Sequence, residues 1–65
     1  MSTIGKNLKK LRELKGISQD RLSKLADISL NTIAKLELGE NPNPTIDTLN
    51  KISKALGVKV DDLIK

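Results

Sequence analysis

Apolar side chains recur at helical spacing along the first fifteen residues of the chain. Steps of four, three and three positions put four of them on one face of a helix: Ile4, Leu8, Leu11 and Leu14. Gly16 follows, and glycine readily adopts the left-handed conformation found just past a helix C-terminus. The pattern predicts an amphipathic helix over residues 3–15.

Two shorter helices are predicted next, over residues 18–26 and 29–38. Each begins at a serine, Ser18 or Ser29, whose hydroxyl can cap the first turn. Asp27 occupies the connection and tolerates left-handed geometry, while Gly39 closes the second of these helices. We expect their buried residues to be Leu22, Leu25, Ala26, Ile33 and Leu36.

Two further helices complete the chain. The loop from Glu40 to Pro44 contains two prolines, which restrict the residues before them to extended conformations. Thr45 then caps a helix over residues 45–56, and a short helix follows over residues 60–64. Their expected inward-facing residues are Ile46, Leu49, Ile52, Leu56, Val60, Leu63 and Ile64. Because no segment alternates like a strand, the sequence predicts an all-α fold of five short helices.

Composition narrows the possible chemistry. The 65 residues include no Cys and no His, so a disulfide, a thiol nucleophile and an ordinary zinc or iron site are excluded. Catalysis by a carboxylate pair or an activated lysine needs a pocket, for which so small a core leaves little room. We therefore expect no enzyme, cofactor or small-molecule ligand. With no secretory-type segment and no apolar run of about 18 residues, we expect a soluble, cytoplasmic protein.

The positive charge is concentrated at the N-terminus. Residues 1–15 hold five basic side chains and one acidic one, whereas the other fifty hold seven of each. Such a basic helix can attract phosphate on nucleic acid or on an acidic membrane, although for the charge alone a solvated helix face is the simpler explanation. The chain has no aromatic residue on which single-stranded bases could stack. This favours double-stranded DNA over RNA among nucleic acids.

Several motifs are specific when taken in order. They are the run LRELKGISQDRLS from Leu11 to Ser23, the apolar Ile33 and Leu36 followed by Glu37 and Gly39, the proline-containing loop, and TLNKISKALGV from Thr48 to Val58. Over residues 4–64 this set resembles the lambda-repressor-like, Cro/C1-type (XRE-type) helix-turn-helix DNA-binding domains. The resemblance implies a compact five-helix fold and a single DNA-binding domain over residues 1–65.

The chain departs from that family at a few positions. Asp27 stands where the family most often has Gly, and Ser23 stands where it most often has Ala. In the loop after the third helix, members often carry Lys or Arg, whereas this chain has Glu40, Asn41 and Asn43. The electrostatic part of DNA binding is therefore weaker at this loop.

The resemblance implies that the third helix enters the major groove and reads bases through Leu30, Asn31, Thr32 and Lys35. Asn31 can pair with adenine, Lys35 can reach guanine acceptors and Leu30 can contact a thymine methyl group. Other roles remain open: Asn31 as a solvated or capping residue, Thr32 as a local cap partner and Lys35 as a phosphate neutraliser.

The same resemblance implies DNA phosphate contacts from Ser18, Gln19, Asn41, Asn43 and Lys10. Capping is a sufficient role for Ser18, ordinary turn chemistry suffices for the two asparagines, and Lys6, Lys9 and Lys10 contribute only if their face is turned toward the duplex. Arg12 and Glu37 match positions that form a structural ion pair between the first and third helices.

Two hypotheses of function follow. The first is a transcriptional repressor that binds a palindromic operator as a homodimer, with half-sites about 34 Å apart. The second is a protein interaction module or antitoxin-like component that uses the same fold to hold a protein partner. The second is motivated by an apolar stripe on the third helix, formed by Leu30, Ala34 and Leu38.

Overall fold

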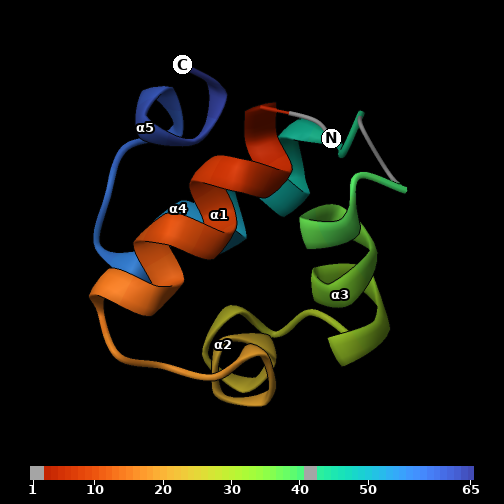
Figure 1. Ribbon diagram of the computed structural model, residues 1–65, viewed down its shortest axis with the longest axis vertical. Helices are drawn as coiled ribbons and strands as arrows, with labels where there is room; N and C mark the ends of the chain where they lie inside the picture. The colour runs from red at the N-terminus through yellow and green to blue at the C-terminus, as the bar shows by residue number, and fades with distance from the viewer. Residues whose placement is uncertain (1–2, 41–42) are drawn as a thin grey trace.

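The computed structural model describes residues 3–40 and 43–65 and contains five α-helices and no strand within these ranges (Figure 1). The helices are α1 (Thr3–Leu14), α2 (Gln19–Ala26), α3 (Leu30–Leu38), α4 (Ile46–Leu56) and α5 (Val60–Ile64). The all-α, five-helix fold predicted from the sequence is confirmed. The main difference in bounds is that the predicted ranges of α2, α3 and α4 included the N-cap residue.

Three of the helices begin at hydroxyl caps. The side-chain oxygens of Ser18, Ser29 and Thr45 accept a hydrogen bond from the backbone N–H three residues later, at 3.0, 3.1 and 3.1 Å respectively. Each cap satisfies one of the amides that a helix start leaves without an intrahelical partner. The predicted cap residues therefore set where α2, α3 and α4 begin.

The turn between α2 and α3 depends on the backbone of Asp27. This residue adopts the left-handed conformation, with φ 57° and ψ 47°, and is the only non-glycine residue with positive φ in the described part of the chain. Its N–H donates to the carbonyl of Lys24, and the next N–H, of Ile28, donates to that of Ser23. The left-handed residue ends α2 sharply, so that α3 starts three residues later at an angle to it.

The helices pack in a closed order. The main partners of α1 are α3 and α5, those of α2 are α3 and α4, and α4 also packs against α5. In Figure 1, α1 crosses the front, α3 lies at the right, α2 at the bottom and α5 at the top, with α4 behind α1. Every helix contributes to the central core, which consists of Leu8, Leu22, Ala26, Ile33, Leu36, Leu49, Ile52, Leu56 and Leu63.

Some apolar residues expected in the core lie outside it. Leu25 is 49% exposed, and the α2 face that packs inward contains Leu22, Ser23 and Ala26 instead. Ser23 can be buried because its hydroxyl donates to the carbonyl of Asp20 at 2.6 Å. Three more residues of the predicted apolar faces lie at helix ends and are exposed: Leu14 (72%), Ile46 (67%) and Ile64 (49%).

A side-chain contact joins α1 to the last residues of the chain. The amide nitrogen of Asn7 donates to the carbonyl oxygens of Leu63 at 2.8 Å and Lys65 at 3.0 Å. These carbonyls lie at the C-terminal end of α5, and the last carbonyls of a helix have no intrahelical partner. Asn7 therefore holds this five-residue helix against α1.

Candidate nucleic-acid interface

The exposed face of α3 carries most of the predicted base-reading residues. Leu30, Asn31 and Lys35 are exposed, whereas Ile33 and Leu36 on the opposite side are fully buried. The core thus holds one face of α3 while the other is free to meet a partner. The largest extent of the molecule is 22 Å, and a major groove about 12 Å wide admits one helix, not the whole protein.

Thr32 is occupied in capping. Its backbone N–H donates to the Ser29 hydroxyl, and the two side-chain hydroxyl oxygens lie 2.8 Å apart, within hydrogen-bond distance. This is the local cap role that the sequence left open for Thr32. Base reading by Thr32 stays a prediction, and its side chain is half-buried at the first turn of α3.

The apolar stripe of α3 is exposed at both ends. Leu30 is 45% exposed and Leu38 is 69% exposed, with a half-buried Ala34 between them. The predicted base readers Asn31 and Lys35 lie directly beside this stripe, one residue further along the helix at each turn. The face therefore offers both hydrogen-bonding and methyl groups to whatever it contacts.

The start of α2 combines a cap with a fixed side chain. Ser18 uses its hydroxyl for the N–H of Arg21, which leaves the backbone amides of Gln19 and Asp20 as the two remaining donors of the first turn. The side chain of Gln19 is half-buried, and its Nε2 donates to Oε1 of Glu37 at 3.0 Å. Gln19, which is assigned to phosphate contact, is therefore hydrogen-bonded to Glu37, which is assigned to the structural ion pair.

Arg12 and Glu37 form a buried, two-pronged ion pair. Arg12 Nε donates to Glu37 Oε2 at 2.7 Å and Nη2 donates to Oε1 at 3.1 Å, with only 12% and 5% of the two side chains exposed. The remaining guanidinium nitrogen, Nη1, donates to the carbonyl of Ile17 at 2.7 Å. The pair joins α1, α3 and the loop that leads into α2.

The hydrogen bond from Arg12 to Glu37 raises the pKa of Arg12 above its ordinary value, against a smaller opposing effect of burial. A raised pKa of a basic group stabilises the fold at every pH below the ordinary value and is lost only as pH rises through the higher one. Arg12 therefore stays charged throughout the neutral range.

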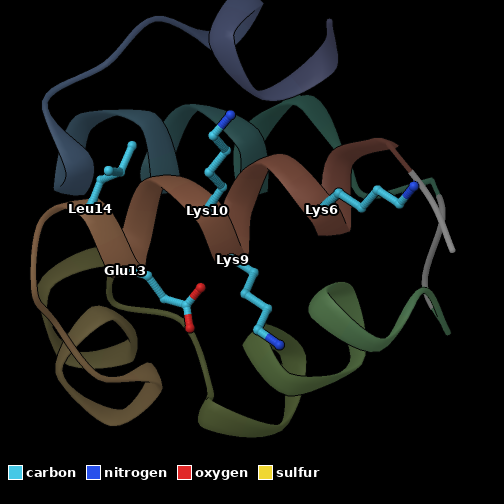
Figure 2. A pocket seen from close by; sticks show the side chains of 5 residues that line it. All are labelled: Lys6, Lys9, Lys10, Glu13 and Leu14. Atoms are coloured by element: carbon cyan, nitrogen blue, oxygen red, sulfur yellow. The ribbon is translucent and has the colours of Figure 1, made fainter.

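The basic residues of α1 diverge. Lys6, Lys9, Lys10, Glu13 and Leu14 line a shallow depression on the outer face of this helix. Figure 2 shows Lys9 extending toward α3, whereas Lys10 extends to the other side of α1, toward α5. Of the two, Lys9 is the better placed to add positive charge near α3, and the sequence pattern alone did not separate them. The phosphate contact assigned to Lys10 stays a prediction.

The loop between α3 and α4 presents little charge for phosphate. Glu40 and Asn43 are both exposed, and Asn41, the other asparagine assigned to phosphate contact, lies outside the described residues. Within the described ranges, no group of three His, Cys, Asp or Glu residues could hold a metal ion. No described helix is long and apolar enough to cross a membrane.

The sequence model of a protein family described as helix-turn-helix matches residues 8–63. One relative is the SPbeta prophage-derived uncharacterized HTH-type transcriptional regulator YonR of Bacillus subtilis, 41% identical over 62 residues, which cover 95% of this chain and 56% of YonR. Another is the immunity repressor protein of Bacillus phage phi105, 29% identical over 95% of this chain and 42% of the repressor. The chain thus spans about half the length of these two relatives.

The fold is also similar to a solved structure. The crystal structure of the restriction-modification controller protein C.AhdI from Aeromonas hydrophila superposes with a TM-score of 0.90 and 27% sequence identity. The match covers 95% of this chain and 92% of C.AhdI. Since the two chains match over nearly their whole lengths, the likeness extends to all five helices.

Proposed function

Because the chain belongs to the Cro/C1-type helix-turn-helix family, we propose that residues 1–65 form a single domain that binds a specific double-stranded DNA sequence and represses transcription. In this proposal α3 inserts into the major groove and α2 crosses the phosphate backbone. The observation that carries it is the exposed pair Asn31 and Lys35 on a helix whose opposite face is fixed in the core.

Asn31 and Lys35 are the main base readers in this proposal. A side-chain amide can form two hydrogen bonds with adenine, and an ammonium group can donate to the two acceptors of guanine in the major groove. Leu30 contributes contact with a thymine methyl group, and Thr32 lies at the same helix start as the lesser contributor. Each well-formed pair between side chain and base discriminates by about 1–3 kcal/mol.

Phosphate contacts fix the orientation of the domain on DNA. The first phosphate-binding group consists of the backbone amides at the start of α2 and the side chain of Gln19. The second is the uncharged side chain of Asn43, in the loop before α4. Lys9 adds longer-range attraction from α1. Because only a few of these groups are charged, we expect the affinity to depend modestly on salt.

We propose further that two copies bind one operator symmetrically. A homodimer needs a palindromic site, and its two α3 helices then enter the same side of the duplex about 34 Å apart. A single domain makes few base contacts, so a second copy is the simplest source of the specificity that repression requires.

The test is selection from a random duplex library at moderate salt. We expect an enriched palindrome whose half-sites are one helical turn apart. Asn31→Ala should relax the preference at one base pair per half-site, whereas Asn50→Ala, which alters an exposed asparagine on α4, should leave the selected sequence unchanged. Recovery of no enriched sequence would contradict sequence-specific binding, and an enriched site without symmetry would contradict the dimer.

A second function is favoured by one observation, the exposed stripe of Leu30, Ala34 and Leu38. In an interaction module or antitoxin-like component, this stripe binds a protein partner and base reading is secondary. The two functions are separated by affinity capture with and without the selected duplex. A partner that is captured without DNA, and lost in Leu38→Ser, would support the second function.

A further inference from the structure

The carboxylate of Glu37 holds two side chains from different helices. Its Oε2 accepts from Arg12 Nε at 2.7 Å, and its Oε1 accepts both from Arg12 Nη2 at 3.1 Å and from Gln19 Nε2 at 3.0 Å. Glu37 lies near the end of α3 and is 7% exposed. One buried group therefore links α1, the first residue of α2 and α3.

This contact determines how the Gln19 amide is turned. An ionised carboxylate can only accept hydrogen bonds, so the nitrogen of the Gln19 amide must face Glu37 and its oxygen must face elsewhere. The second N–H of the same nitrogen is then available to another acceptor. A glutamine without such a partner samples many rotamers, and ordering it reduces the gain from any contact it makes.

We propose that Glu37 is a positioning residue for DNA phosphate binding: it orients Gln19 so that the second N–H of the Gln19 amide meets a backbone phosphate oxygen. The inference rests on the proposed DNA-binding function. Because Glu37 belongs to α3 and Gln19 to α2, the same hydrogen bond sets the distance between the phosphate contact and the base readers. The relative positions of the phosphate-binding side chain and the base-reading side chains are therefore set within the protein before it binds DNA.

A purely structural ion pair makes a different prediction. Arg12 alone satisfies both oxygens of Glu37, so Gln19 is not needed to neutralise the carboxylate. If the pair only stabilises the fold, Gln19 contributes to DNA binding equally whether or not Glu37 can accept its hydrogen bond. The coupling between residues 19 and 37 in DNA affinity separates the two roles.

The experiment is a double-mutant cycle on the selected duplex and on a random one, at a temperature where circular dichroism shows every variant folded. Gln19→Ala should weaken binding to both duplexes about five- to tenfold, because a phosphate contact is independent of sequence. In the Glu37→Gln background, the remaining oxygen keeps the contact with Arg12 Nε and an NH2 group, which cannot accept from Gln19, stands in the place of Oε1. The same change should therefore weaken binding less than about twofold.

Arg12→Lys is the matched control. It disturbs the same buried pair and lowers stability, but it leaves both oxygens of Glu37 in place, so the full effect of Gln19→Ala should persist. If Glu37→Gln does not fold, Arg12→Met with Glu37→Met replaces the pair by apolar side chains, which commonly preserves stability, and removes the acceptor for Gln19.

The outcomes are distinguishable. An equal effect of Gln19→Ala in the Glu37→Gln and unsubstituted backgrounds would overturn the positioning role and leave the proposed function intact, as would no effect of Gln19→Ala at all. If Gln19→Ala also has no effect on DNA binding in the Arg12→Lys background, the lost coupling reflects a general loosening of the fold. That result would also overturn the positioning role of Glu37. Failure of the unsubstituted protein to bind any duplex would overturn the proposed function itself.

Discussion

Removing the cap of α3 should damage DNA recognition more than it damages the fold. Ser29 Oγ accepts the backbone N–H of Thr32 at 3.1 Å and lies 2.8 Å from the Thr32 hydroxyl oxygen. The change Ser29→Ala removes both contacts, and the next two residues are the candidate base readers Leu30 and Asn31. The first turn of α3 is therefore the part of the molecule that this substitution loosens.

The magnitude follows from the geometry of the cap. Replacing a hydroxyl N-cap by alanine costs about 1 kcal/mol, and since this cap is exposed the released groups can bind water. In a domain of this size, that lowers the melting temperature by about 4–8 °C. If the same loss of about 1 kcal/mol falls on the first turn of α3, the fraction of molecules in which this turn is unfolded rises about fivefold. We expect the affinity for the selected duplex to fall by up to the same factor.

Thr45→Ala provides the control. Its Oγ1 accepts the N–H of Thr48 at 3.1 Å and donates to the Thr48 hydroxyl at 3.0 Å, which is nearly the geometry of the Ser29 cap. The two variants should therefore lose similar stability in urea or thermal unfolding followed by circular dichroism. They should differ in the ratio of affinities for selected and random duplexes, measured by fluorescence anisotropy of labelled DNA.

We expect Ser29→Ala to lower that ratio and Thr45→Ala to leave it unchanged, because only the first cap precedes the base readers. An equal decrease in the ratio of affinities for the selected and random duplexes in both variants would mean that DNA recognition depends on overall stability. An unchanged ratio in Ser29→Ala would mean that the start of α3 does not read bases. Either result would refute the reasoning.

Three further predictions concern single residues. Lys35→Ala should relax the base preference at one position of each selected half-site, while Lys51→Ala, which removes the exposed partner of Asp47, should leave the selected sequence unchanged; an unchanged preference in Lys35→Ala would contradict the assignment of Lys35 to base reading. Asn7→Ala removes two hydrogen bonds to the end of α5 and should cost about 1–2 kcal/mol in urea unfolding, with amide exchange accelerated to a similar degree in α5 and α2 because the domain opens as one unit. Asp27→Ala should destabilise by about 1 kcal/mol because its φ is 57°, whereas Asp27→Gly should not; a cost shared by both would implicate the lost carboxylate instead.

The helix boundaries could be predicted because they depend on local chemistry. A hydroxyl cap, a left-handed aspartate and a glycine each act on the backbone within a few residues, so Ser18, Asp27 and Gly39 can be interpreted from their neighbours alone. The angular position of α2 was less predictable. Leu25 was expected in the core, yet the helix is turned so that Ser23 is buried, because Ser23 is small and can satisfy its hydroxyl within its own turn.

The candidate site was predictable only in part. The residue types at the start of α3 and the Arg12–Glu37 partners follow from the family resemblance. The hydrogen bond from Gln19 to Glu37 does not, because it joins side chains eighteen residues apart whose meeting depends on how α2 and α3 pack. The different directions of Lys9 and Lys10 likewise depend on the positions of α3 and α5 around α1.

The closed order in which the helices pack has a consequence for how the molecule comes apart. Each helix is held mainly by two others, so detaching any one of them opens two interfaces, and none lies at an end from which separation could proceed stepwise. Unfolding should therefore be a single cooperative event. A duplex bound at α2 and α3 would then slow hydrogen exchange in α5 as well, which makes α5, a helix with no assigned DNA contact, a reporter of occupancy.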